Sequence, residues 1–174
     1  LVEPLAVGLH AARRAQINVG EWVAVIGCGV IGLGAIAAAS AMGARVIAID
    51  IDDRKRNIAL ECGAQRFLNS QQCDVAAELV LLNDGRGPEV VIEAVGNQQT
   101  IEQATGLVAF SGRVVYVGYA KQPVSYQSAQ FLMKELDIRG SRNATVADPL
   151  EQADHAFSDW ASDPGAYTKI LIDL

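Results

Sequence analysis

The chain has 174 residues, of which 51% are apolar and only 6% aromatic, and its formal net charge is −6. This length fits one domain with a sizeable core, so we interpret residues 1–174 as a single domain. The negative charge argues against a surface that binds nucleic acid. The three cysteines, Cys28, Cys62 and Cys73, are odd in number and lack C-x-x-C spacing. They indicate a reducing compartment, the cytoplasm, and argue against a disulfide framework or a cysteine-built structural zinc site.

Apolar runs typical of buried strands alternate with helical stretches along most of the chain. A helix is expected over 3–15 and another over 148–161, and residues 167–174 (YTKILIDL) fit a short extended segment. Between these helices lie the alternating elements: strands at 22–27, 45–50, 66–69, 89–95, 112–118 and 136–142, and helices at 30–42, 53–62, 74–82 and 97–109. Asp52 fits the N-cap of the second of these helices, and Gly63 fits its C-terminal stop. The alternation implies right-handed crossovers, so the fold class is α/β, a doubly wound parallel sheet of about six strands.

The turn after the first strand carries the most specific pattern, Gly27-Cys28-Gly29-Val30-Ile31-Gly32, a G-x-G-x-x-G. Gly27 allows a tight turn, Gly29 lets a pyrophosphate approach the backbone, and Gly32 lets the following helix pack close to the strand. The pyrophosphate is expected on the free N–H groups at the positive end of the helix dipole. Asp50, at the end of the second strand, can accept hydrogen bonds from both hydroxyls of an adenosine ribose and would repel a 2′-phosphate. The segment therefore predicts a Rossmann fold that prefers NAD to NADP.

The same segment has a competing interpretation, because residues 22–44 carry no charge and are long enough to span a bilayer. Glycines at 27, 29, 32, 34 and 43 interrupt this run, and no positively charged cluster flanks it as a signal peptide or membrane anchor requires. A parallel strand that is covered on both faces is also a continuous apolar run. We therefore expect no membrane partner.

Two later strands also end in glycine, with Val95-Gly96 after the fourth and Val117-Gly118-Tyr119 after the fifth. A ligand of an open α/β sheet lies across the carboxyl ends of the strands, where small residues leave room for it. We therefore include these positions in the predicted cofactor site. The competing interpretation is that the glycines only turn the chain. Cys28, inside the glycine turn, is interpreted as a tolerated small residue rather than a redox centre.

Taken together, these motifs resemble the cofactor domain of zinc-dependent medium-chain alcohol dehydrogenases, especially the sorbitol (polyol) and threonine dehydrogenase branches. The resemblance is carried, in order, by EPLAVGLHAARRAQINVGEWVAVIGCGVIGLGAIAAASAMGARVIAIDIDDRK, VIEAVG, GRVVYVGY and FLMKELDIRGSRNA. It implies a two-domain enzyme in which this piece carries NAD. Hydride would move between the nicotinamide and the carbon of a zinc-bound alcohol, a small-molecule substrate.

The resemblance also implies roles for single residues. Val30 and Ile31 join the three glycines around the pyrophosphate, and Ile31 also touches the nicotinamide face. Lys55 stands where relatives place a basic residue against the ribose, although a solvated helix charge explains it equally well. The nicotinamide half is expected to lie near Val7, Val117, Gly118, Tyr119, Ser141 and Arg142.

Glu3 occupies the place where many members of this family have a cysteine ligand of the catalytic zinc. The resemblance implies a glutamate that touches zinc directly or through a water, whereas from the sequence alone Glu3 is an acid favoured by the helix dipole. The other expected zinc ligands have no counterparts in this sequence, and His10 and His155 are interpreted as ordinary helix residues. We therefore expect a fragment that lacks its zinc-binding catalytic domain and is inactive alone.

Three functions follow from these observations. The first is the NAD-binding domain of a zinc-dependent polyol or secondary-alcohol dehydrogenase. The second is a stand-alone NAD-binding module used for sensing or assembly. The third is a Rossmann-like methyltransferase, against which the third glycine and the later VGY strand weigh.

Self-association is expected through a sheet edge, as a homodimer or a higher homo-oligomer. Residues 122–126 (QPVSY) alternate polar and apolar side chains after the fifth strand and are predicted to be an edge strand that meets its own copy. The alternative is a solvent-covered loop on a monomer.

Overall fold

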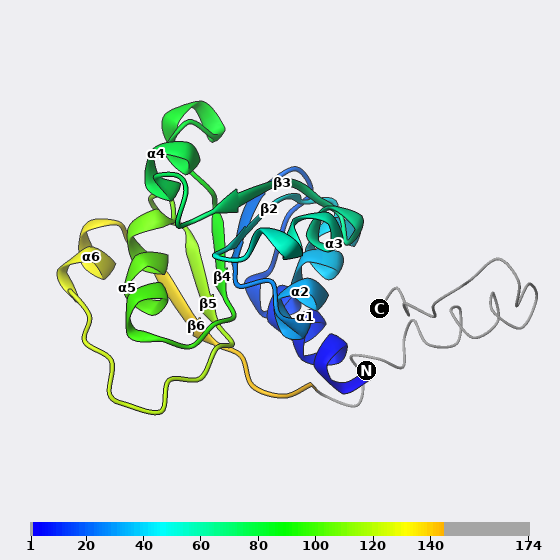
Figure 1. The fold of residues 1–174 in the computed structure, drawn as a ribbon. Coiled ribbons are helices and arrows are strands. Elements are labelled where there is room, and N and C mark those ends of the chain that lie inside the picture. Colours follow the sequence, from blue (N-terminus) through cyan, green and yellow to red (C-terminus); the bar gives the residue numbers. More distant parts are fainter. Residues whose placement is uncertain (1, 145–174) are drawn as a thin grey trace, which may run out of the picture.

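The computed structural model describes residues 2–144, which form a six-stranded, wholly parallel sheet with helices on both faces (Figure 1). The strand order is β3-β2-β1-β4-β5-β6. The strands are β1 Trp22–Ile26, β2 Arg45–Asp50, β3 Ala64–Asn69, β4 Val90–Glu93, β5 Arg113–Tyr116 and β6 Asp137–Gly140. The chain winds outward from β1 to β3 and then from β4 to β6, so the predicted doubly wound α/β fold is confirmed. The order reverses between β1 and β4, where ligands of such sheets bind.

The helices cover the two faces of the sheet separately. They are α1 Val2–Ala15, α2 Val30–Ala41, α3 Arg56–Glu61, α4 Val75–Val80, α5 Gln98–Leu107 and α6 Ala129–Met133. Alternate strand residues point to opposite faces. One set, which includes Val25 and Ile92, packs with apolar residues of α1, α2 and α3. The other set, which includes Ile26 and Val91, packs with residues of α4 and α5. The strands are therefore buried on both sides, which explains their continuous apolar sequences.

The predicted helix boundaries between β2 and β3 are confirmed. A 3₁₀ turn, Asp53–Lys55, leads into α3, and the Asp52 side chain accepts a hydrogen bond from the Arg54 N–H at 3.0 Å. After α3, Gly63 has a φ of +102°, the left-handed conformation that glycine adopts without strain. Local capping chemistry thus sets both ends of this helix.

Within residues 2–144, residues 122–126 pair with no strand of the same chain, and their pairing with a second copy stays a prediction. Strand β6 occupies the place beside β5, and the segment before it is irregular. The Gln98 side chain hydrogen-bonds both the N–H and the carbonyl of Ser125 at 3.0 Å, so this stretch pairs with a side chain and not with a strand. Tyr126 packs edge-to-face on Tyr116 and Phe131. Helix α6 follows and was not predicted.

The uncharged run of residues 22–44 divides into β1, the glycine turn and α2, which has 12 residues. Across residues 2–144, none of the helices combines the length and the apolar composition that a membrane crossing requires. The predicted helix over 148–161, the extended segment 167–174 and His155 lie outside the described residues.

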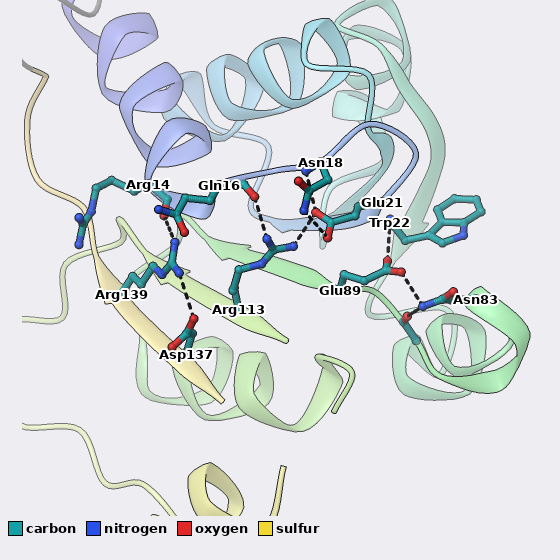
Figure 2. Close-up of polar contacts among 11 residues, drawn as sticks. Arg14, Gln16, Asn18, Glu21, Trp22, Asn83, Glu89, Arg113, Asp137 and Arg139 are labelled. Carbon is teal, nitrogen blue, oxygen red and sulfur yellow. Dashed lines mark hydrogen bonds and ion pairs between the residues drawn. The ribbon is translucent and has the colours of Figure 1, made fainter. Parts of the chain in front are cut away.

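The amino edge of the sheet is tied to α1 by a network of arginines (Figure 2). Arg113, the first residue of β5, donates to the Gln16 carbonyl at 2.7 Å and pairs with the Glu21 carboxylate. Glu21 also accepts from the N–H and the side-chain amide of Asn18, at 2.8 and 3.1 Å. Arg139 of β6 donates to the Arg14 carbonyl at 2.8 Å. Two guanidinium groups therefore satisfy carbonyls near the C-terminus of α1, where a helix leaves acceptors unpaired and its dipole favours cations.

This network predicts a pH-dependent contribution of Glu21 to stability. Burial raises the pKa of Glu21, but hydrogen bonds from Asn18 and the ion pair with Arg113 outweigh it, so the pKa lies below the ordinary value of 4.5. A lowered folded-state pKa gives stabilisation that is complete above the unfolded-state pKa and is lost as the pH falls through the folded-state value. Glu21→Gln should therefore lower the free energy of unfolding by about 1–2 kcal/mol at neutral pH, and by less in acid.

Urea denaturation followed by circular dichroism, at neutral pH and well below pH 4.5, would measure this difference. The matched control is Glu78→Gln, because Glu78 pairs with Arg66 at the surface and such pairs contribute less than about 1 kcal/mol. Equal losses for the two variants at neutral pH, or a Glu21→Gln loss that does not shrink in acid, would contradict the assignment.

Candidate functional site

A cavity of about 540 Å³ opens at the carboxyl edge of the sheet, at the point where the strand order reverses. Its walls come from the ends of β1, β2 and β4, from the loop after β3 and from one side of α5. The lining residues used below are Gly27, Gly29, Asp50, Ile51, Lys55, Ser70, Gln71, Val95, Asn97, Gln99, Thr100 and Gln103. Segments that are far apart in the sequence thus meet around one space.

The glycine turn brings the N-terminus of α2 to this cavity. Gly27 has a φ of +97° and donates its N–H to the Ile49 carbonyl at 2.8 Å. A Cβ on Gly32 would lie 1.8 Å from the Gly27 carbonyl oxygen, so only glycine lets the first turn of α2 close onto the loop. A Cβ on Gly29 would meet nothing within 4 Å, and Gly29 lines the cavity. The open space in front of the first α2 N–H groups fits an anion such as a pyrophosphate.

Asp50 is held in a fixed orientation at the end of β2. Its side chain accepts hydrogen bonds from the Cys28 N–H at 2.7 Å and the Asp52 N–H at 3.0 Å, and it pairs with the Lys55 ammonium at 3.3 Å. Asp50 is only 8% exposed, yet it lines the cavity. A carboxylate has about four lone-pair positions, so three donors leave acceptor capacity for a ligand hydroxyl. The hydrogen bond to Cys28 also links the Asp50 strand end directly to the glycine turn.

Cys28 is buried within that turn and contributes to the core. Burial and the neighbouring Asp50 carboxylate raise the pKa of its thiol to about 12. A thiol is a nucleophile and metal ligand only as the thiolate, so Cys28 is inert at neutral pH. The geometry supports the interpretation of Cys28 as a small packing residue.

The turns after β4 and β5 lie against each other beside the cavity. Gly96 has a φ of +78°, and a Cβ on it would lie 2.4 Å from the Tyr119 nitrogen. Val117 and Gly118 both donate their N–H groups to the Glu93 carbonyl at 2.9 Å. Tyr119 is 83% exposed. Val95 lines the cavity, whereas Val117, Gly118 and Tyr119 are outside its lining.

The remaining residues of the predicted site lie away from the cavity lining. Val7 is buried in α1, and Glu3 is exposed in the first turn of the same helix. Ser141 is buried after β6 and donates its N–H to the Tyr116 carbonyl at 2.8 Å, while Arg142 is exposed. Residues 2–144 bring together no group of three or more side chains with metal-ligand chemistry. The structure thus assembles Gly27, Gly29, Asp50, Lys55 and Val95 around one space, and leaves the predicted nicotinamide and zinc positions outside it.

The sequence analysis missed two kinds of residue at this site. One is the polar side of the cavity, formed by Ser70 and Gln71 after β3 and by a face of α5. No sequence pattern marks exposed glutamines as cavity-lining. The other is Glu93, a fully buried carboxylate at the end of β4. An acid inside the apolar run VVIEAV was a signal for it, because a buried charge requires partners.

Known proteins are similar to this chain in sequence and in fold. The family model described as zinc-binding dehydrogenase matches residues 30–159. D-xylulose reductase of Scheffersomyces stipitis is 40% identical over 142 residues, which cover 81% of this chain and 39% of the reductase. The structure of galactitol-1-phosphate dehydrogenase from Escherichia coli has a TM-score of 0.72 at 36% identity, over 80% of this chain and 42% of that one.

A putative zinc-binding dehydrogenase from Sinorhizobium meliloti, determined with bound NADP, has a TM-score of 0.77 at 34% identity. That match covers 84% of this chain and 44% of the other. The chain therefore spans less than half the length of each of these relatives. Both the family match and the relatives confirm the resemblance to zinc-dependent medium-chain dehydrogenases with polyol-related members, and they count against the methyltransferase interpretation. By its sequence and by its fold, the chain belongs to the zinc-binding dehydrogenase family.

Proposed function

We propose that residues 1–174 are the NAD-binding domain of a zinc-dependent dehydrogenase that moves hydride between NAD and a polyol or other secondary alcohol. The observation that carries the proposal is the joint placement of Gly29, the α2 N-terminus and the Asp50 carboxylate around one cavity. Phosphate and ribose of a dinucleotide are the groups that these features recognise. The names of the relatives, a xylulose reductase and a galactitol-phosphate dehydrogenase, support the substrate class.

In this proposal the residues of the chain bind and orient the cofactor. The first turn of α2, with Val30 and Ile31, holds the pyrophosphate, and Asp50 accepts hydrogen bonds from the adenosine ribose. Val95 and Ile51 offer apolar surface at the cavity, with 45% and 61% of their area exposed. When bound, NAD supplies the nicotinamide ring that accepts or returns the hydride. Val7, Val117, Gly118, Tyr119, Ser141 and Arg142 are proposed to face that half.

The charges around Asp50 support a preference for NAD over NADP. Arg54 pairs with Asp52 at 2.8 Å, Lys55 with Asp50 at 3.3 Å and Arg56 with Asp53 at 2.6 Å. Every cation of this segment thus has an acidic partner, and Asp50 itself would repel a 2′-phosphate. The structure of one relative was determined with NADP, so membership of the family does not fix the cofactor. The proposed preference for NAD rests on the charges around Asp50.

The alternative function, a stand-alone NAD-binding module, uses the same cavity. It differs in needing no zinc and no alcohol. In the preferred proposal Glu3 approaches the zinc, directly or through a water, and the other ligands belong to a separate catalytic domain of a longer protein. We also infer a reducing, cytoplasmic location, because the three cysteines are odd in number and lack C-x-x-C spacing.

Titration calorimetry with NAD and NADP tests the cofactor assignment. The chain should bind NAD more tightly, and Asp50→Asn should weaken NAD by about 1.5 kcal/mol, roughly tenfold in Kd, while the discrimination against NADP shrinks. Asparagine keeps an oxygen for the Cys28 N–H, so the turn is preserved. Asp137→Asn, which makes the same change at an exposed position of β6, is the control. Equal affinity for both cofactors, or a ratio that Asp50→Asn leaves unchanged, would contradict the assignment.

Metal analysis tests the proposal that most zinc ligands belong to a separate catalytic domain. Glu3 offers one carboxylate, whereas a catalytic zinc site needs about three protein ligands. After dialysis without chelator, the 174-residue chain should hold well under one zinc per molecule and should oxidise no polyol with NAD. A full equivalent of zinc, measured by mass spectrometry, would mean that the chain contains a site of its own.

We further infer a homodimer that forms through the β6 edge of the sheet. Asp137 and Ser141 direct their N–H groups to Gly112 and Tyr116, so alternation along the strand turns the Ile138 N–H outward. Within residues 2–144 no strand covers this edge, and an uncovered edge tends to pair with another strand. Light scattering should give a dimer mass that Ile138→Pro reduces to a monomer, whereas a monomer obtained with Val124→Pro instead would place the contact at residues 122–126. A monomeric parent chain, or a dimer that survives Ile138→Pro, would exclude this contact.

A further inference from the structure

Glu93 is the last residue of β4, and its side chain is completely buried. One carboxylate oxygen, Oε1, accepts hydrogen bonds from the N–H groups of Val95 and Gly96, both at 2.9 Å, and from the Thr100 hydroxyl at 2.8 Å. The other oxygen, Oε2, has no hydrogen-bond partner among residues 2–144. A single oxygen thus holds the whole turn between β4 and α5.

The same residue also contacts the segment that follows β5. The Glu93 carbonyl accepts hydrogen bonds from the N–H groups of Val117 and Gly118. A Cβ on Gly118 would lie 2.5 Å from Glu93 Oε2 and 2.3 Å from the Gly96 nitrogen. The unpaired oxygen therefore lies against the place where the turn after β4 and the segment after β5 touch. Glu93 is the residue that contacts both.

Burying the Glu93 carboxylate costs free energy, so the stability of the fold does not explain its presence. The other residues of β4, Val90, Val91 and Ile92, are apolar and fully buried, and an apolar side chain at position 93 would add to the same core. Burying a carboxylate costs free energy unless it is hydrogen-bonded, and in the described part of the chain nothing bonds Oε2. The carboxylate instead fixes the position of Val95 and Thr100 relative to Gly118. Val95 and Thr100 line the cavity, whereas Gly118 lies outside its lining.

The position of this contact relates to how a dinucleotide crosses the sheet. The cavity is lined from the ends of β1, β2 and β4, which accommodate adenosine and pyrophosphate in the proposed function. The end of β5 lies beyond it in the strand order. A ligand that continues from the pyrophosphate toward β5 must pass the contact between Gly96 and Gly118.

We propose that Glu93 is a positioning residue whose carboxylate sets the separation between the turn after β4 and segment 117–119, so that the nicotinamide half of the cofactor fits across it. The inference rests on the proposed function. It predicts that changes at Glu93 weaken binding of the complete dinucleotide more than binding of ADP-ribose, which lacks the nicotinamide ring. A purely structural role would weaken both ligands in the same proportion.

The test compares Glu93→Gln and Glu93→Asp with the parent, using the full-length protein. Glutamine keeps the accepting Oε1 but removes the charge and places an N–H group where Oε2 faces Gly118. Aspartate is one methylene shorter and draws the carboxylate away from Gly96 and Thr100, which gives a milder variant if glutamine impairs folding. The matched control is Glu89→Gln, because Glu89 precedes β4 at the opposite end and also accepts two bonds, from the Trp22 N–H and from Asn83 (Figure 2).

Calorimetry should show the Kd for NAD rising about tenfold in the Glu93 variants, with a change of less than about threefold for ADP-ribose. Glu89→Gln should leave the ratio of the two constants unchanged, even where its thermal unfolding midpoint falls as far as that of Glu93→Gln. Equal changes for NAD and ADP-ribose in both Glu93 variants, or no change in either, would overturn the inference while leaving the proposed function in place. A parent protein that binds neither NAD nor ADP-ribose would overturn the proposed function, and this inference with it.

Discussion

The close approach of Gly32 to the Gly27 carbonyl is the constraint on which the rest of the site depends. Because a side chain at position 32 would overlap that oxygen, the first turn of α2 can close onto the turn after β1 only through glycine. This closure places the α2 N–H groups at the carboxyl edge of the sheet and brings the Cys28 N–H within 2.7 Å of Asp50. The features proposed to bind phosphate and ribose are therefore joined by one contact and one hydrogen bond.

The two edges of the sheet use polar groups for different purposes. At the amino edge, Arg113 and Arg139 are engaged with carbonyls near the end of α1 and with Glu21 and Asp137, so the charges there are paired within the protein. At the carboxyl edge, some polar groups keep hydrogen-bonding positions that the described residues do not fill. Gly29 faces open space, and Glu93 Oε2 accepts no hydrogen bond from any residue that the structure describes. In a sheet that is buried on both faces, polar groups gather at the strand ends, and here the charges at the amino edge are paired while the carboxyl edge carries the proposed binding site.

Much of the fold could be predicted from the sequence because its signals are local. Buried parallel strands have uninterrupted apolar runs, Asp52 and Gly63 mark helix ends, and the spacing from Gly27 to Asp50 is that of a turn, a helix and a strand. The segment 122–126 shows the limit of such signals. Its alternation is typical of an edge strand, but within the chain its Ser125 backbone is hydrogen-bonded by the side chain of Gln98, which is distant in sequence. The periodicity of a segment indicates which of its faces is apolar, but it does not indicate which other segment lies beside it.

The sequence by itself determined the α/β class, the glycine turn and the acid that ends the second strand, because each is indicated by residues that are near one another in the chain. Only the tertiary structure decided which side chains line the cavity and which lie beside it. Ser70, Gln71 and Thr100 reach the same space from separate elements, and Glu93 is inserted between two turns that follow different strands. These relations depend on strand order and on the packing of glycine against backbone, and both arise only when the crossovers have folded onto one sheet.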